Sequence, residues 1–111
     1  MPKVIFVSLA LLASTPAWAI DKAYLGVWTA KAGECDFSGA GPFRITARGL
    51  EEHETSCRTK RARQDSTGWS VQMSCANEGS VDKISLHWQL LSNGHLKEVS
   101  KDGNKDYVRC P

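Results

Sequence analysis

Apolar and polar residues alternate along much of this chain, and this period of two limits its fold more than any other feature. The runs 43–48, 69–75 and 84–90 each place an apolar residue at every second position. Side chains of a β-strand point alternately to opposite faces of a sheet, so each run predicts a strand with one buried face. Because no apolar stripe with helical spacing follows the first twenty residues, the pattern predicts an all-β protein.

Turn-forming residues separate the predicted strands. Gly, Pro, Asn and Asp gather between the alternating runs, as they do in the tight turns of β-hairpins. About seven strands joined by such turns form an antiparallel up-and-down sheet, which either closes into a small barrel or stays a rolled sheet or sandwich. We expect closure, because nothing else would cover two exposed edge strands. The strands are expected near residues 23–30, 43–48, 52–61, 68–76, 81–91, 95–101 and 105–110.

The first nineteen residues predict a signal peptide. Lys3 precedes an apolar run over 4–13, and the small-x-small sequence Ala17-Trp18-Ala19 follows it, which is the pattern that signal peptidase reads. As a helix the run would span about 15 Å, half of a membrane's hydrocarbon core. Cleavage after Ala19 would leave one domain, residues 20–111, with 13 Lys and Arg against 12 Asp and Glu. We therefore expect a periplasmic or secreted protein without a transmembrane segment in its mature form.

Four cysteines in residues 20–111 predict two disulfides, because an even number of cysteines is typical of a short exported chain. In a hairpin, the residue numbers of each opposed pair have the same sum. Cys57 and Cys75 would be opposed in a hairpin whose centre is residue 66, inside the turn expected at 65–67. This favours Cys57 with Cys75, which leaves Cys35 with Cys110. The rival pairing, Cys35 with Cys57 and Cys75 with Cys110, stays open.

Gly26-Val27-Trp28, followed by Cys35 and Asp36, resembles the opening strand of calycin-type barrels, which include lipocalins, avidins and small periplasmic inhibitors of secreted metalloproteases. The resemblance implies that Trp28 packs across one end of a barrel and that Gly26 lets the backbone approach it. It covers only residues 24–36. The chain departs from the inhibitors in having four cysteines and only three residues, 20–22, before the first strand. It also resembles small exported bacterial proteins with a Gly-x-Trp start and a Tyr-x-Arg-Cys end, here 107–110.

A basic stretch follows Cys57: Arg58, Lys60, Arg61 and Arg63 are four cations in six residues. On a regular strand the first two would face one side and the last two the other, so a single patch needs a bulge, a twist or a strand end. The stretch predicts either a contact for an anionic envelope component or acidic protein, or a solvated hairpin tip. Nucleic acid is not expected, since no aromatic residues accompany the cations.

No catalytic or metal-binding motif is present in the sequence. His53, His87 and His95 stand apart from the cysteines, which does not match the spacing of zinc ligands. No Gly-x-Ser-x-Gly nucleophile elbow occurs, and two disulfides would leave no thiol nucleophile. We therefore expect no catalytic residues, no metal and no cofactor.

These features favour an exported, non-enzymatic β-barrel that binds through its rim loops or a strand edge, with inhibition of a secreted or envelope hydrolase as its specific form. The alternatives are a lipocalin-type carrier of a small hydrophobic ligand and an envelope structural protein without a dedicated ligand. Most aromatic residues fall on the buried phase of the strands, which predicts a filled core. A chain of 92 residues is also short for a barrel that holds a ligand.

Overall fold

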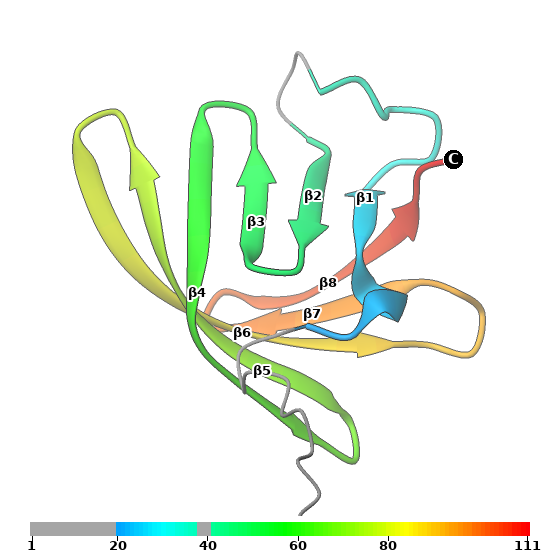
Figure 1. Cartoon of the computed structure of the whole chain (residues 1–111). Helices are drawn as coiled ribbons and strands as arrows, with labels where there is room; N and C mark the ends of the chain where they lie inside the picture. Colours follow the sequence, from blue (N-terminus) through cyan, green and yellow to red (C-terminus); the bar gives the residue numbers. More distant parts are fainter. Residues whose placement is uncertain (1–19, 38–40) are drawn as a thin grey trace, which may run out of the picture.

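The computed structural model describes residues 20–37 and 41–111, in which eight strands form one closed antiparallel barrel (Figure 1). The predicted signal peptide, residues 1–19, lies outside the described residues. A turn of 3₁₀-helix precedes the strands. The elements are η1 (Lys22–Tyr24), β1 (Gly26–Thr29), β2 (Phe43–Thr46), β3 (Gly49–Glu52), β4 (Thr55–Asp65), β5 (Gly68–Asn77), β6 (Ser80–Leu90), β7 (Leu96–Ser100) and β8 (Gly103–Arg109).

Each strand pairs with its neighbours in sequence, and β1 pairs with β8 to close the barrel. The predicted fold class is confirmed, with one strand more than expected. The additional strand is β3, which pairs with β2 and β4. Its four residues are too few to show alternation, so the sequence pattern assigned its last residue to the following strand. The predicted strand near 23–30 begins later than expected, because η1 occupies residues 22–24.

Strand β4 contains a β-bulge that the sequence did not reveal. Its pairing with β5 shifts by one residue between Thr59 and Arg61, which leaves Lys60 without an opposed residue. Thr59 and Ala62 are consequently both buried, although a regular strand would point them to opposite faces. Inward and outward positions on β4 therefore change phase at Lys60.

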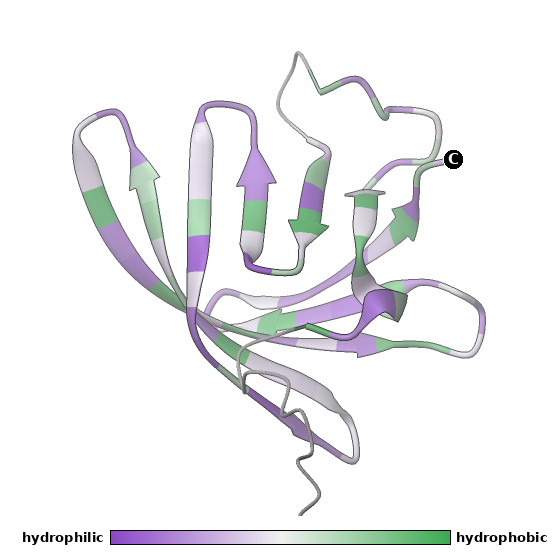
Figure 2. Cartoon of the chain, viewed as in Figure 1, coloured by the Kyte–Doolittle hydropathy of each residue, from purple (hydrophilic) through white to green (hydrophobic). Residues whose placement is uncertain are grey.

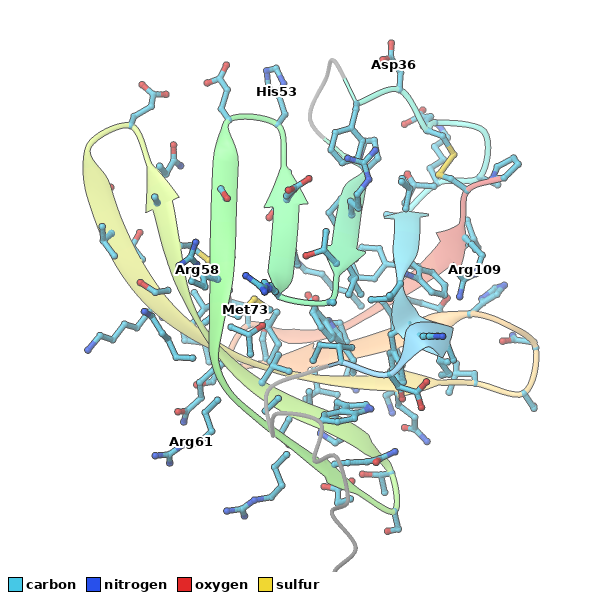
Figure 3. All side chains as sticks on the ribbon, viewed as in Figure 1. Asp36, His53, Arg58, Arg61, Met73 and Arg109 are labelled. Atoms are coloured by element: carbon cyan, nitrogen blue, oxygen red, sulfur yellow. A yellow bond between two sulfur atoms is a disulfide. The ribbon has the colours of Figure 1, made fainter. Side chains whose placement is uncertain are left out.

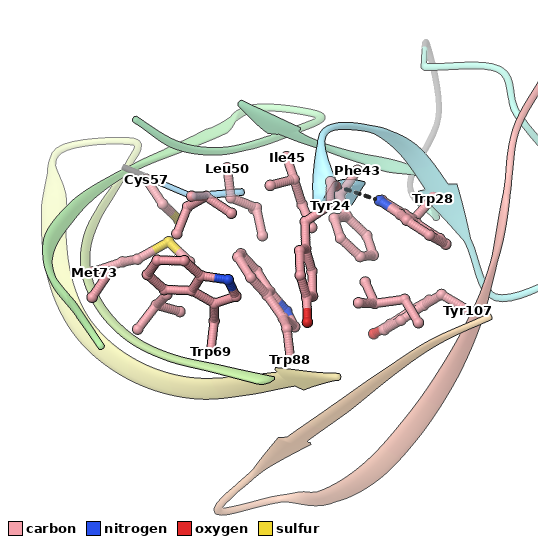
Figure 4. Packing of buried hydrophobic residues seen from close by; sticks show 14 of the residues in the cluster. Tyr24, Trp28, Phe43, Ile45, Leu50, Cys57, Trp69, Met73, Trp88 and Tyr107 are labelled. Carbon is pink, nitrogen blue, oxygen red and sulfur yellow. Dashed lines mark hydrogen bonds between the residues drawn. The ribbon is translucent and has the colours of Figure 1, made fainter. Parts of the chain in front are cut away.

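The inward side chains form a core that is rich in aromatic residues. Hydrophobic and hydrophilic bands alternate along the long strands (Figure 2), as their burial does in β5. Trp28 and Trp88 have no exposed surface, and Trp69 packs in the same cluster (Figure 4). The expectation that the aromatic residues form a core is thus confirmed for these side chains.

Both predicted disulfides are present. Cys57 and Cys75 are opposed residues of β4 and β5, and Cys35 pairs with Cys110. The rival pairing is therefore wrong, and none of the four cysteines is free. Two disulfides are typical of an oxidising, exported environment. No helix within residues 20–37 and 41–111 combines the length and apolar character needed to cross a membrane.

Candidate functional site

A cavity of about 990 Å³ lies beside the aromatic core. Its apolar wall consists of Phe43, Leu50, Ile84, Leu86 and Tyr107. The packed aromatic core expected from the sequence is present, and this partly open cavity lies beside it. Eight strands enclose a wider interior than the expected seven, and the next inward positions on β3 and β7 carry glutamates rather than large apolar side chains.

The cavity extends to a gap in strand pairing. Strand β7 pairs with β6 only from His87 to Leu90, so β6 has no partner on that side over residues 83–86. Both this unpaired segment and the β7–β8 turn at 100–102 line the cavity. An extended ligand can therefore reach the interior without opening the closed strand order.

Glu98 lies between the core and the cavity and is only 9% exposed. Its carboxylate accepts a hydrogen bond from Trp88 Nε1 at 3.0 Å and another from the Tyr107 hydroxyl at 3.4 Å. Burial raises the pKa of Tyr107 far above its usual value of 10, and the Glu98 charge and hydrogen bond raise it further. Tyr107 consequently remains a hydrogen-bond donor, which compensates part of the cost of burying a carboxylate.

Glu52 is a second carboxylate on the cavity wall. Its surface is exposed because it faces the cavity, yet the surrounding protein reduces its solvation. Desolvation raises the pKa of Glu52 above 4.5, the Glu98 charge raises it further, and Lys105 opposes both effects. Among the described residues, neither glutamate has a cationic partner within 4.0 Å. The cavity therefore combines an apolar wall with two carboxylates that have no cation within ion-pair distance. Its lining also includes Asp102, Asp106, Lys83, Lys101 and Lys105.

The residues of the Gly-x-Trp motif form a closed end, which we define as Gly26, Trp28 and Arg109 together with η1. Trp28 Nε1 donates to the Tyr24 carbonyl at 3.0 Å, and the guanidinium carbon of Arg109 lies 4.2 Å from the centre of the Trp28 ring. Arg109 also donates to the carbonyls of Ala23 and Leu25, each at 2.7 Å.

A side chain at Gly26 would obstruct this arrangement. Gly26 has a φ of 129°, and a Cβ placed there would lie 2.8 Å from Nη1 of Arg109. The glycine therefore leaves room for the Arg109 side chain to reach η1, rather than for the approach of the backbone to Trp28 that the calycin resemblance implies. Neither Gly26 nor Trp28 is among the described residues that line the cavity.

The basic stretch lies on the outside of the barrel. Arg58, Arg61 and Arg63 pair with outward-facing Ser74, Gln72 and Ser70 of β5. The bulge at Lys60 shifts the alternation of β4 by one residue, so all three arginines point to the same face of the sheet. Such a bulge was one of the features that a single basic patch required. Lys60, at the bulge, is exposed, and Arg61 projects away from the barrel (Figure 3).

The histidines do not form a metal site. His87 contacts Thr67 and Ser70 through its two ring nitrogens, at 3.1 and 3.0 Å. His95 contacts Asp106 at 2.7 Å, and His53 contacts Glu54 at 3.1 Å. Within the part of the chain that the structure describes, no three His, Cys, Asp or Glu side chains gather closely enough to hold a metal ion.

Comparison with family models, with curated proteins and with solved structures finds no match. The function is therefore inferred from the chemistry of the residues themselves. The sequence interpretation missed Glu52 and Glu98, although a signal was present. Each stands two positions after an inward leucine on its strand, Leu50 or Leu96. A carboxylate on the apolar phase of a strand is unusual enough to indicate a polar site inside a barrel.

Proposed function

We propose that this protein is an exported, non-enzymatic binding protein that holds a small amphiphilic cation inside its barrel. The observation that carries the proposal is the cavity of about 990 Å³ with Glu52 and Glu98 on its wall. Ligand sites are commonly cavities of about 300 to 1,000 Å³ with mainly apolar linings and a few polar groups that orient the ligand. The predicted signal peptide and the two disulfides support a periplasmic or secreted location.

Glu52 and Glu98 favour a cationic group over a neutral or anionic one beside the apolar wall, although Lys83, Lys101 and Lys105 also line the cavity. Glu52 and Glu98 repel each other electrostatically, and a bound ammonium group would offset that repulsion. The apolar wall formed by Phe43, Leu50 and Ile84 suits an aliphatic or aromatic body. A small hydrophobic amine meets both requirements, and it refines the expected hydrophobic ligand of the carrier hypothesis.

Inhibition of a hydrolase remains a prediction without a supporting contact among the described residues. Ile20 is buried, and Arg109 holds the carbonyls of Ala23 and Leu25 against the barrel. Residues 20–25 are therefore not available for insertion into a protease cleft. The rim loops or an unpaired strand edge would have to provide the contact instead.

Binding of three matched probes tests the proposal: decylammonium, decanol and decanoate, each below its micellar concentration. Tryptophan fluorescence and native mass spectrometry should show that decylammonium binds most tightly and decanoate most weakly. Glu52→Gln should weaken decylammonium binding while leaving decanol binding unchanged. Ile84→Trp, which adds volume to the cavity wall, should abolish binding of all three.

Arg44→Gln provides a control, since Arg44 lies on β2 with an exposed side chain that pairs with Glu51 outside the cavity. It should bind all three probes as the unaltered protein does. The proposal fails if the folded protein binds none of them, or if Ile84→Trp binds as well as the unaltered chain. Equal affinity for the cation and the anion would reject the role given to the carboxylates.

A further inference from the structure

The outer face of β4, β5 and β6 carries a second feature, which adjoins the cavity along residues 83–86 and 100–101. Two hollows, of about 530 and 470 Å³, lie on this face and share Gln72 and Ser85 in their linings. We call them together the basic groove. Arg61, Arg63 and Lys101 line the first hollow, and Lys60 and Lys83 line the second.

The strand register places these cations on two sides of β5. Arg58 is opposed to Ser74, which is opposed to Lys83 on β6. Two rows further along, Arg63 is opposed to Ser70 and then to His87. Neighbouring strands lie about 4.8 Å apart, so the flanking strands are separated by about 10 Å. Ser70 and Ser74 are four residues apart, which gives the groove a length of about 13 Å.

The cations of the basic groove have no ion-pair partners among the residues that the structure describes. Arg58, Lys60, Arg61, Arg63, Lys83 and Lys101 are all exposed, and no carboxylate of residues 20–37 or 41–111 lies within 4.0 Å of them. This differs from Arg44 and Lys31 elsewhere on the barrel, which pair with Glu51 and Glu34. Like charges held this close repel one another, and a bound polyanion would relieve that repulsion.

The one carboxylate that lines either hollow is held by its own turn. Asp65 accepts hydrogen bonds from the backbone amide and the hydroxyl of Thr67, at 2.8 and 2.7 Å. Since the only hydroxyl hydrogen of Thr67 goes to Asp65, Thr67 must accept a hydrogen bond from Nε2 of His87. Ser70 in turn contacts Nδ1 of the same ring. This network fixes the end of the groove and holds the Asp65 carboxylate out of ion-pair distance of Arg61 and Arg63.

We propose that the basic groove binds an extended anionic polysaccharide along β5. The floor consists of Ser70, Gln72 and Ser74, whose hydroxyl and amide groups can hydrogen-bond sugar hydroxyls while the flanking cations contact sulfate, phosphate or carboxylate groups. Clusters of Lys and Arg of this length are also a pattern of heparin-binding surfaces. Arg61, Arg63 and the floor residues do not line the cavity, whereas Lys83, Ser85 and Lys101 border both the groove and the cavity.

The lining favours a polysaccharide over other polyanions. No Phe, Tyr or Trp lines either hollow, whereas single-stranded nucleic acids stack their bases on such side chains. Val81 is the exposed large hydrophobic residue of the described chain and lines neither hollow, whereas a membrane-binding surface inserts several. An acidic protein would also require an accessible apolar centre in the interface. The apolar residues that line the hollows are all buried or half-buried: Val71, Met73, Ile84, Leu86 and Val99.

The test compares retention of the full chain by heparin and polygalacturonate, with an oligothymidylate and anionic phospholipid vesicles as competing probes. We expect retention by at least one polysaccharide that weakens as salt concentration rises. Arg61→Ser/Arg63→Ser should weaken this binding about tenfold or more, as expected when two direct charge contacts are lost. Arg61→Lys/Arg63→Lys should retain most of it.

The matched control is Lys22→Ser/Lys31→Ser, which removes two positive charges from η1 and the segment after β1, across the barrel from β5. This variant should bind as the unaltered chain does. An equal loss in both serine variants would show that net charge alone matters and would overturn the proposal. Failure of the folded protein to bind either polysaccharide would also overturn it, as would binding confined to the oligonucleotide or the vesicles. Circular dichroism of each variant establishes that it is folded.

Discussion

The disulfide between Cys35 and Cys110 should contribute more stability than the one between Cys57 and Cys75. The first joins residues 75 positions apart and the second residues 18 apart. In the chain-entropy description, the restriction of the unfolded chain grows with the logarithm of loop length. This gives about 4.5 kcal/mol for the longer loop and about 3.2 kcal/mol for the shorter one. Cys35→Ala/Cys110→Ala should therefore lose about 1.3 kcal/mol more than Cys57→Ala/Cys75→Ala.

Urea unfolding followed by tryptophan fluorescence, with linear extrapolation to water, measures this difference. The structure also predicts where the variants differ locally. Strands β1 and β8 pair over only two positions, and the Cys110 amide donates to the Val27 carbonyl at 2.8 Å. Hydrogen exchange at Cys110 and Val108 should accelerate in the Cys35→Ala variant and stay slow in the Cys57→Ala variant.

The loop-length reasoning is wrong if Cys35→Ala/Cys110→Ala proves more stable than Cys57→Ala/Cys75→Ala. Cys57, Cys75 and Cys110 are buried and Cys35 is half-buried. Lost packing would therefore make Cys57→Ala/Cys75→Ala the less stable variant, and it cannot produce the expected order. Equal unfolding free energies, with slow exchange at the β1–β8 pairing in both, would mean that strand pairing and Arg109 close the barrel without the disulfide.

Two further predictions concern individual charged groups. Arg109→Met should lower the free energy of unfolding by about 2 kcal/mol, because two charge-assisted hydrogen bonds and the contact with Trp28 are lost. Arg44→Met, at an exposed ion pair, should change it by less than about 1 kcal/mol, and similar values would contradict the closing role of Arg109. Glu52→Gln should raise the thermal midpoint of unfolding at neutral pH. The pKa of the Glu52 carboxyl is raised in the folded state, so the protein loses stability as the pH rises through that pKa. The gain should vanish well below pH 4.5, the usual pKa of a glutamate, and a gain that is independent of pH would exclude ionisation as its cause.

The sequence predicted well those features that follow from a geometric rule within one strand or one hairpin. Alternation of apolar and polar residues identifies strands because successive side chains of a strand point to opposite faces of the sheet, as in residues 69–75. The hairpin sum identified the Cys57–Cys75 disulfide because it placed the turn to within one residue. The bulge at Lys60 lies between the turn and the cysteines, and it shifts the register so that Cys57 is opposed to Cys75 rather than to Ala76. No pattern in the sequence predicted this shift.

The features that the sequence did not predict depend on distant strands. Whether Glu52 faces a cavity depends on the size of the side chains that β6, β7 and β8 place opposite it. Arg58 and Arg61 share a face only because β4 has an extra residue opposite β5. No pattern within β4 specifies where that extra residue lies. Both features become predictable only once the strand order and register are known.

The bonds of Arg109 and Cys110 also determine the order in which this chain can mature. Their partners are Ala23, Leu25 and Cys35, so these contacts connect residues 75 or more positions apart. A nascent chain that has not yet emerged as far as Arg109 can form the β4–β5 hairpin, whose residues are all close in sequence, but it cannot close the barrel. Oxidation of Cys57 with Cys75 should therefore precede that of Cys35 with Cys110. An oxidising enzyme that acted during emergence would meet Cys35 before its proper partner is accessible.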